Sequence, residues 1–273
     1  QDIILDSAST YTGTVAFAGT TLADVTINDS NALDLAALTL TGNLSVTAGG
    51  AVTQSGALVI PGTTTISASG FDVTLATATN NFTGAVAVTG ADVQLVDAGA
   101  IVLGASTVSG TYSVIATASG GITQTGALAV TGASTFQADT SNDITLTTTT
   151  NNYVGAVAIT SGRNVQLVDA GAIDLGASTV TGTLAVTATT GGDITDSAAI
   201  SVGGTSTFTA ANGQDIILDS ASTYTGTVAF VGTTLANVTI NDSGAFDLAA
   251  LTLTNNLSVT AGGAVTQSGA LVI

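Results

Sequence analysis

The chain has 273 residues, a formal net charge of −17, no His or Cys, and Arg163 as its only base. This charge excludes a nucleic acid as partner, because phosphates are bound by Lys and Arg. The missing His, Cys and Lys exclude Ser-His-Asp triads, thiol nucleophiles and Schiff-base lysines, so we expect no enzyme activity. No apolar run approaches the roughly 20 residues that a membrane helix needs, and we expect no membrane insertion.

The composition favours strands over helices throughout the chain. Glu is absent and Gln is rare, although surface helices are built from such long helix-forming side chains. Thr and Val suit a pleated surface, whereas Gly, Asn and Asp suit turns. The sequence therefore predicts an all-β fold.

The stretch 1–60 returns almost unchanged as the stretch 214–273. Gln1 corresponds to Gln214, which defines a super-repeat of period 213, and the two copies differ at five positions. This long period divides into related modules, which we place at 63–132, 133–204 and 205–273, the last one incomplete, with 1–62 as the tail of a preceding module. Fixed periods of this kind indicate a repeat architecture, so we expect residues 1–273 to form one continuous solenoid cut from a longer protein.

Within the module 133–204, nine short segments alternate apolar and polar residues with a period of two, which is typical of strands that bury one face. Grouping them by three gives three coils of about 24 residues per module and about 11–12 coils in the chain. The best interpretation is a right-handed parallel β-helix, that is, a β-solenoid with about three short strands per coil. An antiparallel β-sandwich is the alternative, but it does not explain the sub-repeats.

The recurring sequence ITQTGALAVTGASTF, followed by NDITLTTTTNNYVGAVAI and NVQLVDAGAIDLG, resembles the repeat region of filamentous-haemagglutinin-type exoproteins, which are large bacterial β-helical adhesins. The similarity is one of pattern and composition over the whole chain, and it contains no catalytic motif. It implies a right-handed parallel β-helical shaft, an extracellular or cell-surface location, and a role in adhesion or in a biofilm matrix. No functional residue is carried over.

The residues that could bind a metal are aspartates, and the candidates recur in the repeats. Asp29, Asp97, Asp169 and Asp242 are expected at one corner, and Asp2, Asp72, Asp143 and Asp215 at one strand entrance. Neighbours in such a column would lie three coils apart, too far to share one Ca²⁺. We therefore expect no cofactor and at most weak calcium binding at Asp29, Asp97, Asp169 and Asp242.

Carbohydrate chemistry is the second possibility, because glycoside hydrolysis needs two carboxylates. The pairs Asp193 with Asp196 and Asp92 with Asp97 are close in sequence, but aligned modules replace Asp196 by Gln and Asp92 by Asn. Turn and strand-end roles are the expected ones for these residues. The aromatic residues Phe82, Tyr153, Tyr11 and Tyr224 mark an enlarged corner, where we expect them to pack over the coil edge rather than to stack on a glycan.

These observations favour a structural function: a non-catalytic shaft of an extracellular bacterial fibre or adhesin, which associates end to end or continues as a longer chain. Two alternatives are a β-helix that binds or cleaves carbohydrate and a calcium-dependent surface-layer or matrix component. A glycan or another cell-surface molecule is the expected external partner.

Overall fold

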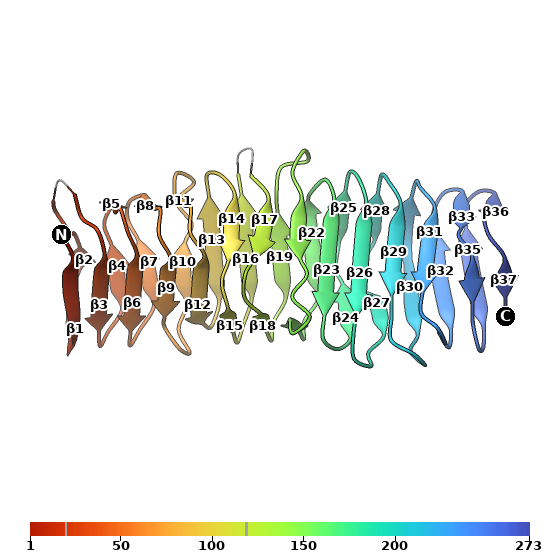
Figure 1. The fold of residues 1–273 in the computed structure, drawn as a ribbon, viewed down its shortest axis with the longest axis horizontal. Coiled ribbons are helices and arrows are strands. Elements are labelled where there is room, and N and C mark those ends of the chain that lie inside the picture. The colour runs from red at the N-terminus through yellow and green to blue at the C-terminus, as the bar shows by residue number, and fades with distance from the viewer. Residues whose placement is uncertain (20, 118–119) are drawn as a thin grey trace. The chain divides into compact units, whose positions relative to one another are not determined.

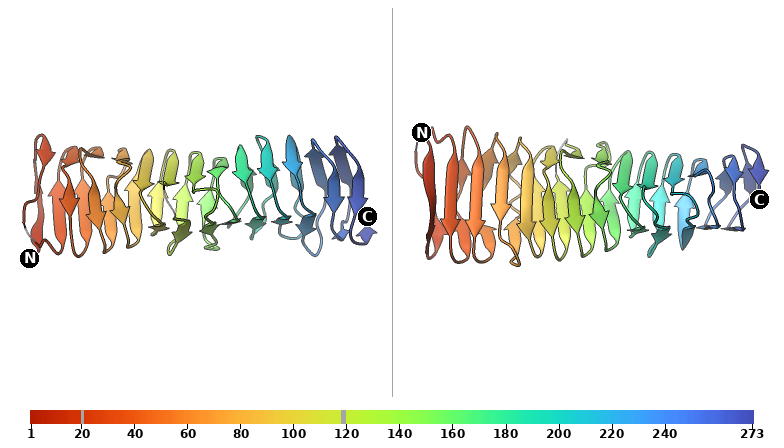
Figure 2. Two further views of the ribbon diagram at one scale, coloured as in Figure 1. Left: turned by 90° about the horizontal axis from the view of Figure 1, so that it is seen from above. Right: turned by 60° about the horizontal axis from the view of Figure 1, so that its bottom comes forward.

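A computed structural model describes residues 1–19, 21–117 and 120–273, in which 37 strands and no helix occur. The strands pair in parallel and form a β-solenoid of about 13 coils, which confirms the predicted fold class and slightly exceeds the predicted number of coils. The chain divides into two compact units, Gln1–Gly132 and Ala133–Ile273, which are described separately below. Figures 1 and 2 show that successive coils lie side by side within each unit.

In the N-terminal unit each strand pairs with the equivalent strand of the next coil, so the strands form three rows. The first row contains β1 (Ile3–Ser9), β3 (Val25–Asp29), β6 (Leu44–Ala48), β9 (Thr64–Ser67), β12 (Val86–Gly90), β15 (Ser106–Val108) and β18 (Leu128–Val130). The second contains β2 (Thr14–Val15), β4 (Leu33–Leu35), β7 (Val52–Gln54), β10 (Val73–Leu75), β13 (Val93–Asp97) and β16 (Tyr112–Ala116). The third contains β5 (Leu38–Thr39), β8 (Leu58–Ile60) and β11 (Asn81–Phe82). The strands β14 (Ile101–Leu103) and β17 (Ile122–Gln124) pair with each other, and β14 also pairs with the start of β12.

The C-terminal unit has the same organisation. One row contains β20 (Ile144–Leu146), β23 (Val165–Asp169), β26 (Leu184–Ala188), β29 (Ser206–Thr209), β31 (Val228–Val231), β33 (Phe246–Leu248) and β36 (Val265–Gln267). A second contains β24 (Ile173–Leu175), β27 (Ile194–Asp196), β30 (Ile216–Tyr224), β32 (Val238–Asp242) and β35 (Leu257–Ala261). The third contains β19 (Ser134–Gln137), β22 (Val157–Ser161), β25 (Ser178–Val180), β28 (Ile200–Val202) and the end of β30, and the remaining strands are β21 (Asn152–Tyr153), β34 (Leu251–Thr252) and β37 (Leu271–Val272).

The coils are shorter than predicted. Val25 pairs with Leu44, Leu44 with Thr64, and Thr64 with Val86, so each of these coils takes fewer residues than the sequence suggested. The module 133–204 contains ten strands, β19 to β28, instead of nine. The additional strand is β21, Asn152–Tyr153, which the sequence suggested only as an insertion. A strand as short as β21 cannot show an alternating pattern.

Ten strands are one more than three complete coils, so a repeated residue does not return to the same row. Ser134 and Ser206 start equivalent strands of successive modules, and each pairs with the equivalent valine of the next coil, Val157 on β22 and Val228 on β31, but β22 and β31 belong to different rows. In the C-terminal unit these two positions therefore lie on different rows. Equivalent positions of successive modules therefore do not form one column along the unit.

The core of each unit is aliphatic and lies inside the coils. Along β3, β6 and β12 buried residues alternate with more exposed ones, as expected for strands with one inward face. The largest fully buried side chains are aromatic, and they include Tyr112, Phe82, Phe136, Phe208 and Phe246. Phe208 stacks on Phe230, its partner on the next coil, with ring centroids 5.9 Å apart. Outward positions carry short, mostly uncharged side chains.

Candidate functional site

A buried asparagine holds the enlarged corner of the N-terminal unit. The Asn80 side chain is fully buried, and its Nδ2 donates to the carbonyl oxygens of Leu75 and Val96, both at 3.2 Å. Its Oδ1 accepts the Leu58 N–H at 2.9 Å, and the two amide groups of Asn80 and Gln54 are paired by bonds of 2.7 and 2.8 Å. Asn80 therefore bridges consecutive coils and satisfies backbone groups that the corner leaves without a strand partner.

A buried aspartate of the following coil caps the same corner. Asp97 accepts the N–H of Phe82 at Oδ2 and the N–H of Gly99 at Oδ1, both at 2.6 Å. Asp169 makes the same two bonds of 2.6 Å to Tyr153 and Gly171 in the C-terminal unit. Burial raises the pKa of Asp97 and of Asp169, and the backbone N–H bonds oppose this rise without cancelling it. Both oxygens of each carboxylate are therefore occupied by the protein's own backbone.

The corners within the two long repeats, 1–60 and 214–273, differ from the corners at Asn80 and Asn151. Asp29 and Asp242 are each 1% exposed, and their Oδ1 atoms accept N–H groups from Asn31 at 3.0 Å and Gly244 at 2.8 Å. Their Oδ2 atoms are buried and have no hydrogen-bond partner among the described residues. Between the last leucine of the strand and the aromatic residue these corners contain the five residues DSAST, whereas the corners at Phe82 and Tyr153 contain the six residues ATATNN and TTTTNN. We call the two kinds Asn corners and Ser corners.

The four candidate metal ligands do not share a corner, contrary to the prediction. Within the N-terminal unit Asp29 lies on β3 of the first row and Asp97 lies on β13 of the second. Within the C-terminal unit Asp169 lies on β23 and Asp242 on β32, again in different rows. The reason is the module of ten strands, which moves each equivalent residue by one row. No group of three or more acidic side chains suited to a metal ion occurs among the described residues.

Polar side chains at the starts of the strands form ladders along the solenoid. These ladders were not predicted from the sequence. Asp24 Oδ1 accepts the N–H of Asn43 at 2.6 Å, and Asn43 Oδ1 accepts the N–H of Thr63 at 2.8 Å, so each side chain bonds the backbone of the next coil. Asp2 adds a bond of 3.3 Å from the Asp24 N–H. The available signal was an Asp, Asn or Thr that stands directly before a strand once in every coil. Asp2 and Asp24 therefore lie on adjacent coils. The predicted separation of three coils between aspartates holds only for residues at equivalent positions of successive modules.

The other candidate residues are distributed over the same features. Arg163 forms a bidentate pair with Asp143, at 2.8 and 3.0 Å, and this pairing lowers the pKa of the Asp143 carboxyl. Asp92 is exposed on a ladder, whereas Asp97 is fully buried. Asp193 accepts the Asp215 N–H at 2.8 Å, whereas Asp196 is buried. Neither sequence pair therefore presents two carboxylates to a common surface.

The aromatic residues of the enlarged corners lie inside the solenoid rather than over the coil edge. Phe82 is 0% exposed, and Tyr153 and Tyr224 are each 2% exposed. The Tyr153 ring packs edge-on against Phe136, with centroids 6.3 Å apart, and Tyr224 packs edge-on against Phe208 at 6.1 Å. The Tyr11 side chain is half-buried. Phe82, Tyr153 and Tyr224 therefore offer no platform on which a sugar could stack.

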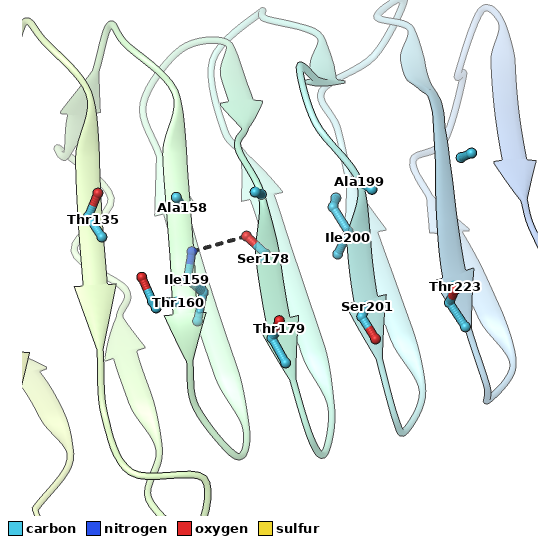
Figure 3. A pocket seen from close by; sticks show the side chains of 12 residues that line it. Thr135, Ala158, Ile159, Thr160, Ser178, Thr179, Ala199, Ile200, Ser201 and Thr223 are labelled. Atoms are coloured by element: carbon cyan, nitrogen blue, oxygen red, sulfur yellow. Dashed lines mark hydrogen bonds between the residues drawn. The ribbon is translucent and has the colours of Figure 1, made fainter.

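One shallow groove runs across β19, β22, β25 and β28 of the C-terminal unit and has a volume of about 500 Å³. Its lining consists of small side chains, among them Thr135, Ala158, Thr179, Ser201 and Thr223, which follow one another on successive coils (Figure 3). Ser178 points inward beside it and accepts the Ile159 N–H at 3.0 Å, the bond that Figure 3 marks. The groove contains no charged side chain.

A smaller hollow of about 250 Å³ lies on the N-terminal unit, and two carboxylates line it. Asp72 and Asp92 belong to one ladder, and Thr74, Gln94 and Thr111 complete the polar lining. The Thr111 backbone N–H and its hydroxyl lower the pKa of Asp92, because both donate to its Oδ1 at 2.7 and 2.8 Å. The hollow can hydrogen-bond a hydroxyl-rich ligand.

Comparison with known proteins identifies the repeats. A family model described as "Repeats of unknown function (DUF5649)" matches residues 22–89, 90–160, 162–231 and 235–273. Comparisons with curated proteins and with solved structures found no match. Among the described residues no helix has the length and apolar character needed to cross a membrane. The four matched segments follow one another along most of the chain, which therefore belongs to the DUF5649 family of repeats.

Proposed function

We propose that the chain is a non-catalytic segment of the shaft of an extracellular bacterial fibre or adhesin. The observation that supports this most directly is the way in which each coil is completed by its neighbours: strand pairs, asparagine bridges and side-chain ladders all join consecutive coils. Such a fold gains length by adding coils, and its stability comes mainly from contacts between neighbours.

The outer surface also suits a shaft. Outward side chains are short and mostly Thr, Ser and Ala, and the single Arg163 is held by Asp143, so trypsin-like proteases find almost no site. The resemblance of the repeats to filamentous-haemagglutinin-type exoproteins adds the cell-surface location and the adhesive role to the proposal. Under this proposal, copies associate end to end through strand edges or continue within a longer chain.

The test is to lengthen the protein by a defined amount. A variant with one additional super-repeat should be longer by about ten coils, or roughly 48 Å at the interstrand spacing, in negative-stain electron microscopy and small-angle X-ray scattering. An increase in diameter without an increase in length would contradict the shaft.

Location is tested by protease shaving of intact producing cells followed by mass spectrometry. Recovery of the chain only after lysis would contradict the extracellular assignment.

Carbohydrate binding is the second candidate, because the hollow beside Asp72 and Asp92 presents carboxylates, an amide and hydroxyls together. A glycan array probed with the purified chain tests it. Binding that Gln94→Ala abolishes, and that Thr107→Ala on β15 of the first row leaves intact, would support it. Equal binding by both variants would place the glycan elsewhere.

A further inference from the structure

One inward position at the end of a strand differs in chemistry between the modules. Gln54 ends β7, and its Nε2 donates to the Gly56 carbonyl at 2.6 Å and to Asn80 Oδ1 at 2.7 Å. Gln124 ends β17, and its Nε2 donates to the Gly126 carbonyl at 2.7 Å. In both cases a neutral amide supplies a hydrogen-bond donor to the carbonyl two residues further along the chain.

In the module 133–204 this position is Asp196, at the end of β27, whereas Gln267 occupies it again at the end of β36. Its side chain is 7% exposed, Oδ1 accepts the Ser220 N–H at 3.2 Å, and Oδ2 is buried without a partner among the described residues. The buried asparagine of the next coil is replaced by Ser222, which accepts the Ile200 N–H at 2.9 Å, as Asn80 accepts that of Leu58. An ionised carboxylate has no proton to donate, so it cannot replace the glutamine amide.

No positive charge compensates Asp196. The groups that face it are Asp219 and Tyr224 on β30. Asp242 lies one coil further away, on β32, which pairs with β30. Asp174 on the preceding coil points outward to the Thr195 hydroxyl at 3.4 Å. The only base of the chain, Arg163, is paired with Asp143. The burial of an ionised carboxylate without a positively charged partner costs free energy, and such a group is commonly neutralised by taking up a proton.

We propose that Asp196 is a proton-binding site, at which a carboxylic acid takes the place of the glutamine amide and couples the stability of the C-terminal unit to pH. The protonated carboxyl supplies one O–H donor, as the amides of Gln54 and Gln124 supply N–H donors. Burial, the largest cause, raises the pKa of Asp196, and the charge of Asp219 adds to this rise, whereas hydrogen bonds from Ser220 and from the Asp219 backbone oppose it without cancelling it. Asp196 belongs to the Ser corner that contains Ser222. In the Asn corner that contains Asn80, the equivalent position is occupied by Gln54, which carries no carboxylate.

The direction of the pH effect follows from proton linkage. Because the pKa of Asp196 is raised by folding, the stabilisation is fully present below the unfolded-state pKa and is lost as the pH rises through the folded-state pKa. In this window the folded state holds one proton more than the unfolded state. The folding equilibrium constant therefore falls by up to about tenfold per pH unit.

The experiment compares urea unfolding of the full chain, Asp196→Asn and the control Asp174→Asn between about pH 4 and pH 7. Asp196→Asn should be more stable than the parent chain at pH 7. The slope of its unfolding free energy against pH should correspond to about one bound proton less than in the parent chain. Asp174→Asn should keep the pH dependence of the parent. Infrared spectroscopy of the folded protein in mildly acidic buffer should show a protonated-carboxyl band to which Asp97 and Asp169 also contribute, and Asp196→Asn should reduce the intensity of this band.

Two results would overturn the proposal. One is an unchanged pH dependence and an unchanged carboxyl band in Asp196→Asn. The other is stabilisation of the parent chain at pH 7 by millimolar Ca²⁺ that Asp196→Asn loses, which would assign the site to a metal cation instead of a proton.

Discussion

At the scale of single residues, the corners are held by buried polar side chains that replace missing strand pairs. Asn80 is the clearest case, because it serves the Leu58 N–H, two carbonyl oxygens and the Gln54 amide. The adjacent Asn81 is exposed and takes part in β11 only through its backbone. Two neighbouring residues of the same type therefore have different importance for folding.

We predict that Asn80→Ala is strongly destabilising and that Asn81→Ala is nearly neutral. Each buried backbone group left without a partner costs about 1–3 kcal/mol, whereas exposed substitutions usually stay within about 0.5 kcal/mol. Urea unfolding followed by far-ultraviolet circular dichroism measures both. Equal losses in the two variants would show that the buried bonds do not hold the corner.

At the scale of elements, neighbouring coils approach each other closely where glycines are stacked. The Gly62 N–H donates to the Gly42 carbonyl at 3.0 Å, and a Cβ at Gly84 would lie 2.2 Å from the Gly62 carbonyl oxygen. Real Cβ atoms are essentially never found so close to another atom, so any other residue would push the two coils apart. The same stacking recurs at Gly182, Gly204 and Gly226 in the C-terminal unit.

We therefore expect Gly84→Ala to cost about 1–3 kcal/mol, the range typical of overpacked sites. Gly99→Ala is the matched control, because a Cβ there would meet only Asp97 Oδ1, at an ordinary 3.6 Å. Denaturant midpoints of the two variants give the comparison. A loss at Gly99 as large as that at Gly84 would mean that backbone freedom, and not coil spacing, requires these glycines.

At the scale of the whole chain, the two sequence periods have different structural meanings. A module of ten strands advances an equivalent residue by one row, as Asp169 and Asp242 show in the C-terminal unit. From β1 to its copy β30 the super-repeat contains 29 strands, and the long strand β30 extends over two rows because it pairs with both β27 and β28, so the super-repeat corresponds to about ten three-strand coils. The nearly identical copies, which start at Gln1 and Gln214, are offset by this distance, whereas modules one step apart are only similar.

The net charge of −17 also acts on the whole chain. We predict a higher melting temperature near pH 4.5 than near pH 8 at low salt, because protonation reduces repulsion between aspartates and because burial raises the pKa of Asp97 and Asp169. These two groups favour folding below their raised pKa and lose that effect as the pH rises. Groups with lowered pKa, such as the exposed Asp92 and the half-buried Asp247, oppose the trend and limit it at lower pH.

Thermal unfolding at several pH values and salt concentrations tests this prediction. Salt at about 1 M, where the Debye length is about 3 Å, should reduce the difference without removing it, because buried groups are screened much less. A melting temperature that rises steadily from pH 4.5 to pH 8 would contradict the prediction.

The sequence alone determined the β class, the three strands per coil and the nested periods, because alternation and repetition are local and directly visible. It also indicated that polar residues mark the corners. It could not show that Asn152–Tyr153 is a strand, that Phe82 and Tyr224 point inward, or that Asp29 and Asp97 lie on different rows. These features depend on which residue of one coil meets which residue of the next. That register is set by packing and hydrogen bonds between coils, so only the tertiary structure decided it.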